Sequence, residues 1–142
     1  MSMLDLSFTV AAPHRSFGAQ TEAGALIYAV DDDSDLIELY RLLLAEAGYR
    51  VRTFQHRAQA LAALQVEVNK PDLLITDYFG FSMRVQEFMR ACRRAHPALR
   101  ILMASGLGRV DTLSSSVVPD RFLHKPFTPH EFLEEVRAAL AC

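Results

Sequence analysis

The stretch LIYAVDDDSD at residues 26–35 decides the fold. Five apolar residues in a row, a length typical of a strand, end at three consecutive aspartates. Apolar residues then recur at positions 36, 40, 43, 44 and 47, which is the spacing of one helix face. Asp33 or Ser34 is expected to cap the start of this helix, and Gly48 to end it. The stretch therefore predicts a buried strand followed directly by a helix that packs on it.

The rest of the chain repeats this alternation of strand and helix. Further strands are expected at residues 49–54, 73–76, 101–104 and 121–124, and further helices at residues 57–68, at 84–95 and from Pro129 onward. Thr128 and Glu131 flank Pro129 in the pattern of a capping box. The stretch 107–118 has a weak helical pattern and predicts a short helix. Because parallel strands need crossover connections, the sequence predicts an α/β fold, a doubly wound parallel sheet of five strands with helices on both faces.

The composition excludes several classes of protein. A length of 142 residues suits one domain, and 15 Lys and Arg against 17 Asp and Glu leave no basic surplus for nucleic acid. The two cysteines make no disulfide framework, which favours a reducing compartment, and no apolar stretch approaches the length of a membrane span. Residues 1–24 show no periodicity and are expected to be a flexible leader before a domain at residues 25–142. We therefore expect a cytoplasmic protein with neither a nucleic-acid nor a membrane partner.

Polar residues follow four of the five predicted strands. They are Asp31, Asp32 and Asp33 after the first strand, Asp77 after the third, Ser105 after the fourth and Lys125 after the fifth. In a parallel sheet these strand ends share one edge, where ligands bind. Clustered carboxylates repel one another and favour a hard divalent cation such as Mg²⁺, while an ammonium and a hydroxyl can hold phosphoryl oxygens. An Asp carboxylate can attack phosphorus, so the pattern predicts a site that receives a phosphoryl group on Asp77.

Four short motifs carry a resemblance to a known family. They are VDDD at residues 30–33, LLITD at 73–77, MASG at 103–106 and FLHKPF at 122–127. In this order they resemble the acidic pair, the phospho-acceptor strand, the Ser/Thr strand end and the lysine motif of response regulator receiver domains in two-component signalling. The resemblance covers residues 25–142 and suggests the stand-alone, single-domain type. It implies a flavodoxin-like sheet with the strand order 2-1-3-4-5.

The resemblance also implies a phosphorylation site. Asp77 would accept a phosphoryl group from a histidine kinase or a histidine phosphotransfer protein. Asp32 and Asp77 would bind Mg²⁺ directly together with the backbone carbonyl of Phe79, whereas Asp31 would act through water. The protein would thus be phosphorylated on itself rather than turn over a substrate.

The resemblance further implies a switch and a signalling surface. Ser105 and Lys125 would hold phosphoryl oxygens, and the ring of Phe122 would turn inward as Ser105 shifts. The output face would comprise the helix expected at 107–118, the strand at 121–124 and the final helix. With no output domain, the chain is expected to act on an unknown downstream protein by direct contact or to pass phosphate on within a phosphorelay. A homodimer is one of the partners that the resemblance allows.

Two alternatives stay open at the level of the sequence. The loop after Asp77 departs from the family pattern, with Gly80, Phe81 and Val85 where an apolar residue, Pro and Gly are usual, and this would fit a degenerate receiver that acts without phosphorylation. The Asp-x-Asp spacing of Asp31 and Asp33 also resembles a phosphatase of the haloacid dehalogenase type. That family needs a downstream acidic pair, and the acidic residues after Lys125 all fall in the predicted final helix.

Overall fold

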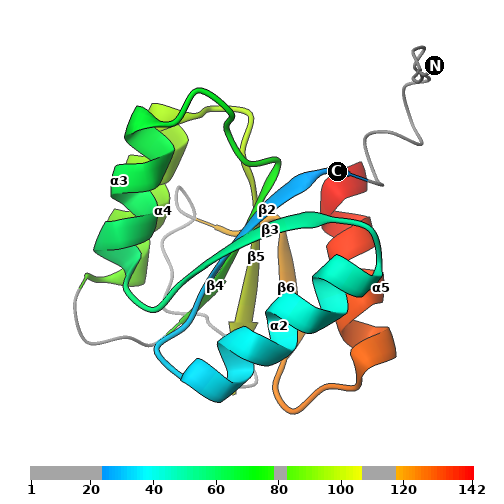
Figure 1. Cartoon of the computed structure of the whole chain (residues 1–142). Coiled ribbons are helices and arrows are strands. Elements are labelled where there is room, and N and C mark those ends of the chain that lie inside the picture. Colours follow the sequence, from blue (N-terminus) through cyan, green and yellow to red (C-terminus); the bar gives the residue numbers. More distant parts are fainter. Residues whose placement is uncertain (1–23, 79–82, 107–117) are drawn as a thin grey trace, which may run out of the picture.

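The computed structural model of the chain describes residues 24–78, 83–106 and 118–142 and contains a five-stranded parallel sheet (Figure 1). Its strands are β2 (Leu26–Val30), β3 (Arg50–Phe54), β4 (Leu73–Asp77), β5 (Arg100–Ser105) and β6 (Arg121–His124). They lie side by side in the order β3-β2-β4-β5-β6, and every neighbouring pair is parallel. Numbered from the first strand, this is the order 2-1-3-4-5, which confirms the predicted fold class.

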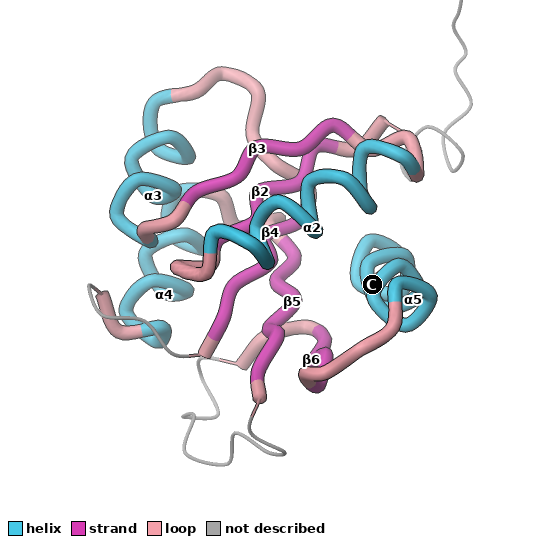
Figure 2. The backbone as a smooth tube through the Cα atoms, turned by 60° about the horizontal axis from the view of Figure 1, so that its bottom comes forward, coloured by secondary structure: helices cyan, strands magenta, loops and turns pink. Residues whose placement is uncertain are grey.

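Four described helices cover the two faces of the sheet. The helices α2 (Ser34–Glu46) and α5 (Pro129–Ala141) lie on one face, and α3 (Arg57–Val66) and α4 (Val85–Ala95) lie on the other (Figures 1 and 2). The helix expected at 107–118 and the leader expected at 1–24 fall outside the described residues, apart from Gly24 and Val118. Among the helices that the structure describes, none is both long and apolar enough for a membrane span.

The start and end of α2 follow from local chemistry. The Asp33 side chain caps the helix by accepting hydrogen bonds from the backbone N–H groups of Asp35, at 3.0 Å, and Leu36, at 3.3 Å. Just beyond the helix, Gly48 adopts a φ of +96°, a conformation that is costly for residues with a Cβ atom. The predicted helix limits are therefore confirmed, with Asp33 rather than Ser34 as the cap.

The other helix limits show one confirmation and one correction. Thr128 and Glu131 form the predicted capping box at the start of α5, with N–H···O distances of 3.0 and 2.8 Å. The helix α3 ends at Val66, two residues before the predicted limit. The reason is that Glu67 adopts an extended ψ of 141° while its N–H still donates to the Ala63 carbonyl oxygen.

Each central strand contributes to a hydrophobic core on both faces of the sheet. In β2, Ile27 and Ala29 pack toward α2 and α5, whereas Leu26, Tyr28 and Val30 pack toward α3 and α4. A strand buried on both faces has no solvent-exposed face, which explains the unbroken apolar run in the sequence. By contrast, β3 lies at an edge, and its Arg50 and Arg52 are exposed, as its alternating sequence predicts.

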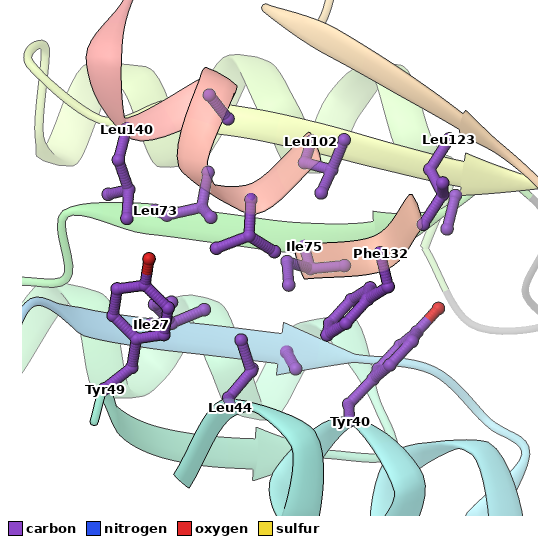
Figure 3. Close-up of a cluster of buried hydrophobic side chains, with 14 of the residues drawn as sticks. Ile27, Tyr40, Leu44, Tyr49, Leu73, Ile75, Leu102, Leu123, Phe132 and Leu140 are labelled. Atoms are coloured by element: carbon purple, nitrogen blue, oxygen red, sulfur yellow. The ribbon is translucent and has the colours of Figure 1, made fainter. Parts of the chain in front are cut away.

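Aromatic rings stack among aliphatic side chains in the core between α2 and α5 (Figure 3). The rings of Tyr40 and Phe132 stack with their centroids 4.9 Å apart and an interplanar angle of 6°, and Phe127 stacks on Phe132 at 5.6 Å. Offset stacks of this kind contribute beyond the area that they bury. This core fixes α5, and with it the segment that leads from β6 into α5, against the sheet.

The register of the strands determines which residues meet at the carboxyl edge. Val30 pairs with Thr76 across β2 and β4. The residues that follow them, Asp31 and Asp77, therefore lie side by side at the ends of the two strands. Asp77 in turn pairs with Ala104 on β5, the neighbour of Ser105. The fold thus brings together side chains that lie far apart in the sequence.

Candidate functional site

Asp31 is a buried carboxylate directly after β2. Its side chain is 2% exposed, and its backbone N–H continues the ladder by donating to the Phe54 carbonyl oxygen at 3.1 Å. The Oδ1 atom accepts a hydrogen bond from the Asp33 N–H at 2.9 Å. Burial raises the pKa of Asp31, and the Asp33 amide and the Lys125 ammonium act in the opposite direction.

The next two aspartates face different surroundings. Asp32 is exposed and contributes a carboxylate oxygen to a group with Asp31 and Asp77, in which the three oxygens lie within 4.8 Å of one another. Asp33 instead uses its side chain to cap α2. Of the three consecutive aspartates, two therefore belong to the acidic group and the third is structural.

Asp77 is the last residue of β4, and its side chain is 15% exposed. The Oδ1 atom accepts a hydrogen bond from the Tyr78 N–H at 2.9 Å, which fixes the orientation of the carboxylate. The backbone carbonyl oxygen accepts one from the Thr76 hydroxyl at 3.1 Å. The carboxylate is thus held at the rim of the sheet, where another molecule can reach it.

Lys125 joins two members of the acidic group. Its Nζ atom lies 3.1 Å from Asp31 Oδ2 and 3.4 Å from Asp77 Oδ1. The chain reaches this position because the Lys125 N–H donates to the Ser105 carbonyl oxygen at 2.9 Å, which extends the pairing of β5 with β6. The peptide bond from Lys125 to Pro126 is cis. The amine partly neutralises the two carboxylates that it contacts.

Ser105 and Phe122 occupy the strands beside the acidic group. Ser105 ends β5, is buried, and pairs with His124 of β6. Phe122 lies on β6 with 38% of its surface exposed, so its ring is not part of the core. The backbone carbonyl of Phe79, the remaining predicted ligand, lies outside the described residues, as do Gly80 and Phe81.

The acidic group suits a small divalent cation. Its donors are all carboxylate oxygens, the ligands that Mg²⁺ prefers, and one side of the group is open to water. Two oxygens bound to one Mg²⁺ are at most about 4.2 Å apart, twice the metal–oxygen distance. The three carboxylate oxygens lie within 4.8 Å of one another, a spacing close to that of ligands that share one cation.

Two polar residues near the site were not found from the sequence. Arg57 is 4% exposed and donates hydrogen bonds to the backbone carbonyl oxygens of Asp77, at the end of β4, and Met83, just before α4, although the sequence pattern predicted only that it begins a helix. Tyr40 is 1% exposed, and within the described part of the chain its hydroxyl group has no hydrogen-bond partner. Burial and the nearby carboxylates of Asp31, Asp77 and Asp33 raise its pKa. Both side chains fit the sequence pattern of an ordinary helix. Their burial beside the acidic group becomes apparent only from their neighbours in the folded structure.

The fold and the acidic group are those of a known family. The family described as the response regulator receiver domain matches residues 27–137, and the chain belongs to this family. It is therefore a receiver domain of two-component signalling rather than a turnover enzyme, and the phosphatase alternative is wrong. Its acidic pocket of Asp31, Asp32 and Asp77 is consistent with phospho-acceptor signalling.

Individual proteins show the same relationship. The transcriptional regulatory protein GltR of Pseudomonas aeruginosa is 31% identical over 127 residues, a match that covers 82% of this chain and 49% of GltR. This chain thus spans about half the length of that relative. The chemotaxis protein CheY4 of Vibrio cholerae is 28% identical with a TM-score of 0.74, over 82% of this chain and 99% of that one. A CheY-like receiver domain of Methanospirillum hungatei has the same fold, with a TM-score of 0.75 at 22% identity, over 84% of this chain and 95% of that one.

Proposed function

We propose that this chain is a phospho-accepting switch in a two-component or phosphorelay pathway, with Asp77 as the acceptor. The donor is a histidine kinase or a histidine phosphotransfer protein, and the signal passes on by protein contact. The observation that carries the proposal is the ammonium of Lys125, placed between Asp31 and Asp77 in a group of three carboxylates. The working unit is residues 25–142, and its compartment is the cytoplasm.

The chemistry follows from the position of Asp77. One carboxylate oxygen attacks phosphorus and forms an O–P bond while the P–N bond of a phosphohistidine breaks, and the leaving imidazole keeps the electron pair and takes up a proton. Mg²⁺, held by Asp32, Asp77 and the Phe79 carbonyl with Asp31 acting through water, would supply positive charge to the phosphoryl oxygens. Lys125 Nζ adds a second cation at the rim, 3.4 Å from Asp77 Oδ1.

The switch involves the two strands beyond β4. The Ser105 hydroxyl group donates to a phosphoryl oxygen on Asp77, and the resulting shift of β5 makes room for the ring of Phe122. That ring has space to move because it is 38% exposed on an edge strand. A groove of about 400 Å³ runs beside it between β6 and α5, with Leu123, Pro126 and Glu134 among its lining residues. Movement of Phe122 would change the shape of this groove and hence its fit to a partner, be that a downstream protein or a second copy.

Labelling with a small phosphodonor tests the proposal. Incubation with acetyl phosphate and Mg²⁺ should add one phosphoryl group by intact-protein mass spectrometry, and a chelator should prevent it. Asp77→Asn should abolish the labelling. Asp35→Asn, which alters an exposed aspartate in the first turn of α2, is the matched control and should be labelled normally. Wild-type protein that stays unlabelled with Mg²⁺ present would instead support the degenerate receiver, which acts without phosphorylation.

A further inference from the structure

Arg57 is a buried cation that contacts the backbone of Asp77, the proposed phospho-acceptor. It is the first residue of α3 and is 4% exposed. Its Nη1 atom donates to the Met83 carbonyl oxygen at 2.6 Å, its Nη2 atom donates to the Asp77 carbonyl oxygen, and its Nε atom lies 3.4 Å from Thr76 Oγ1. One side chain thus links α3, the end of β4 and the backbone that leads into α4.

The positions of these acceptors point to a role in geometry. Asp77 and Met83 stand on either side of residues 79–82, so a single guanidinium holds the backbone where the chain leaves β4 and again just before α4 begins. Thr76, the third partner, also donates its hydroxyl group to the Asp77 carbonyl oxygen. The planar guanidinium has its donors in a fixed arrangement, so it can hold several acceptors in one geometry at once.

The charge of Arg57 also lies within the field of the acidic group. Burial lowers the pKa of Arg57, and the carboxylates of Asp77, Asp32 and Asp31 act in the opposite direction. A cation at this position repels a divalent metal ion, whereas a fixed backbone helps to orient the carboxylates that bind one. These two effects on Mg²⁺ affinity have opposite signs, which allows an experiment to separate them.

We propose that Arg57 is a positioning residue for phosphoryl transfer, which fixes the backbone of Asp77 so that its carboxylate faces Asp31 and Asp32. The phosphoryl-transfer part rests on the function proposed above, whereas the effect on metal binding can be measured without it. Positioning requires the forked guanidinium. A lysine at residue 57 keeps the charge but offers a single nitrogen atom, which cannot reproduce the same set of hydrogen bonds.

Mg²⁺ titrations by calorimetry on three variants test the proposal. Arg57→Gln and Arg57→Lys should both raise the dissociation constant for Mg²⁺ by at least about tenfold, the range seen when residues that orient metal ligands are removed. Arg100→Gln is the matched control, because Arg100 also donates to a main-chain oxygen, that of Cys142 at 2.9 Å, but at the opposite end of the sheet. Its affinity for Mg²⁺ should equal that of the wild type.

The outcomes separate the effect of the hydrogen bonds that the Arg57 guanidinium makes from the effect of its positive charge. Unchanged or tighter Mg²⁺ binding in a folded Arg57→Gln variant, or full recovery in Arg57→Lys, would overturn the positioning role. The rate of acetyl phosphate labelling at saturating Mg²⁺ gives a second readout, which should stay low in both Arg57 variants. Wild-type protein that binds no Mg²⁺ contradicts the proposed function itself, whereas normal labelling and binding in Arg57→Gln contradict only the role of Arg57.

A measurement on the wild type covers the case of a variant that fails to fold. The Nε–H signal of Arg57 in nitrogen-15 NMR spectra should be protected from exchange with water and should shift when Mg²⁺ binds. A signal that exchanges freely, or that does not respond to Mg²⁺, would count against the proposal.

Discussion

Replacing Lys125 by methionine would measure how strongly the amine stabilises the acidic group. Its Nζ atom lies 3.1 Å from Asp31 and 3.4 Å from Asp77, and 24% of its side chain is exposed. At an effective dielectric constant of about 20, each contact has a Coulomb energy of about 5 kcal/mol. Desolvation of the amine and screening at its exposed side cancel part of this energy, so we expect the free energy of unfolding to fall by about 2–4 kcal/mol at neutral pH. Methionine keeps most of the apolar stem, so the loss reports on the charge.

The loss should depend on pH in a defined direction. Burial already raises the pKa of Asp31 above its ordinary value, and removal of Lys125 takes away one influence that opposes the rise. A carboxyl group whose pKa is raised by folding stabilises the fold below its unfolded pKa, and this contribution is lost as the pH rises through the folded pKa. The deficit of Lys125→Met relative to the wild type should therefore be complete at neutral pH and shrink as the pH falls toward the ordinary Asp pKa of about 3.9.

Urea unfolding followed by circular dichroism measures both effects. The titrations are made with a chelator present, and repeated with Mg²⁺, which should recover part of the loss because it restores positive charge. Arg121→Met is the matched control on β6, since Arg121 pairs with Glu135 at 2.9 Å but is 44% exposed, and its loss should not exceed about 1 kcal/mol. A loss for Lys125→Met no larger than that of the control, or a deficit that grows as the pH falls, would refute the reasoning.

Three further substitutions have definite expected outcomes. Tyr40→Phe removes a buried hydroxyl group without a hydrogen-bond partner among the described residues, so the free energy of unfolding should rise by about 1 kcal/mol; a fall in urea titrations would contradict this. Thr128→Ala removes the cap of α5 and should lower the free energy of unfolding by about 1 kcal/mol. An unchanged denaturation midpoint would show that the capping box contributes little. Asp32→Asn removes the exposed carboxylate of the acidic group, so the rise in Tm that Mg²⁺ produces in the wild type should disappear, and a rise that persists in calorimetry would count against Asp32 as a ligand.

The fold was predictable because its main determinants are local and mutually consistent. The runs at residues 26–30 and 73–75 are apolar throughout, since both faces of β2 and β4 are buried, and such runs between helical patterns indicate a parallel sheet. The caps of α2 and α5 were visible as Asp33 and as the Thr128–Glu131 pair. Once the strands are parallel, the position of Asp77 at the same edge as Asp31 follows from topology alone.

The parts of the site that the sequence could not predict depend on distant neighbours. Asp31, Asp32 and Asp33 are chemically identical and adjacent, yet one is buried, one is exposed and one caps a helix. What distinguishes Asp31 is Lys125, 94 residues further along the chain. Arg57 is likewise an ordinary helix residue until β4 and α4 cover it, and no local periodicity encodes that burial.

The place of β4 in the sheet has a mechanical consequence for the domain. This strand is hydrogen-bonded to β2 on one side and β5 on the other, and its first four residues are fully enclosed, so it has little freedom to yield. β6, with one neighbour and three of its four side chains in contact with solvent, is far more compliant. A displacement that began at the tip of β4 would therefore meet least resistance at the two edges of the sheet, β3 and β6, where each strand has a single neighbour.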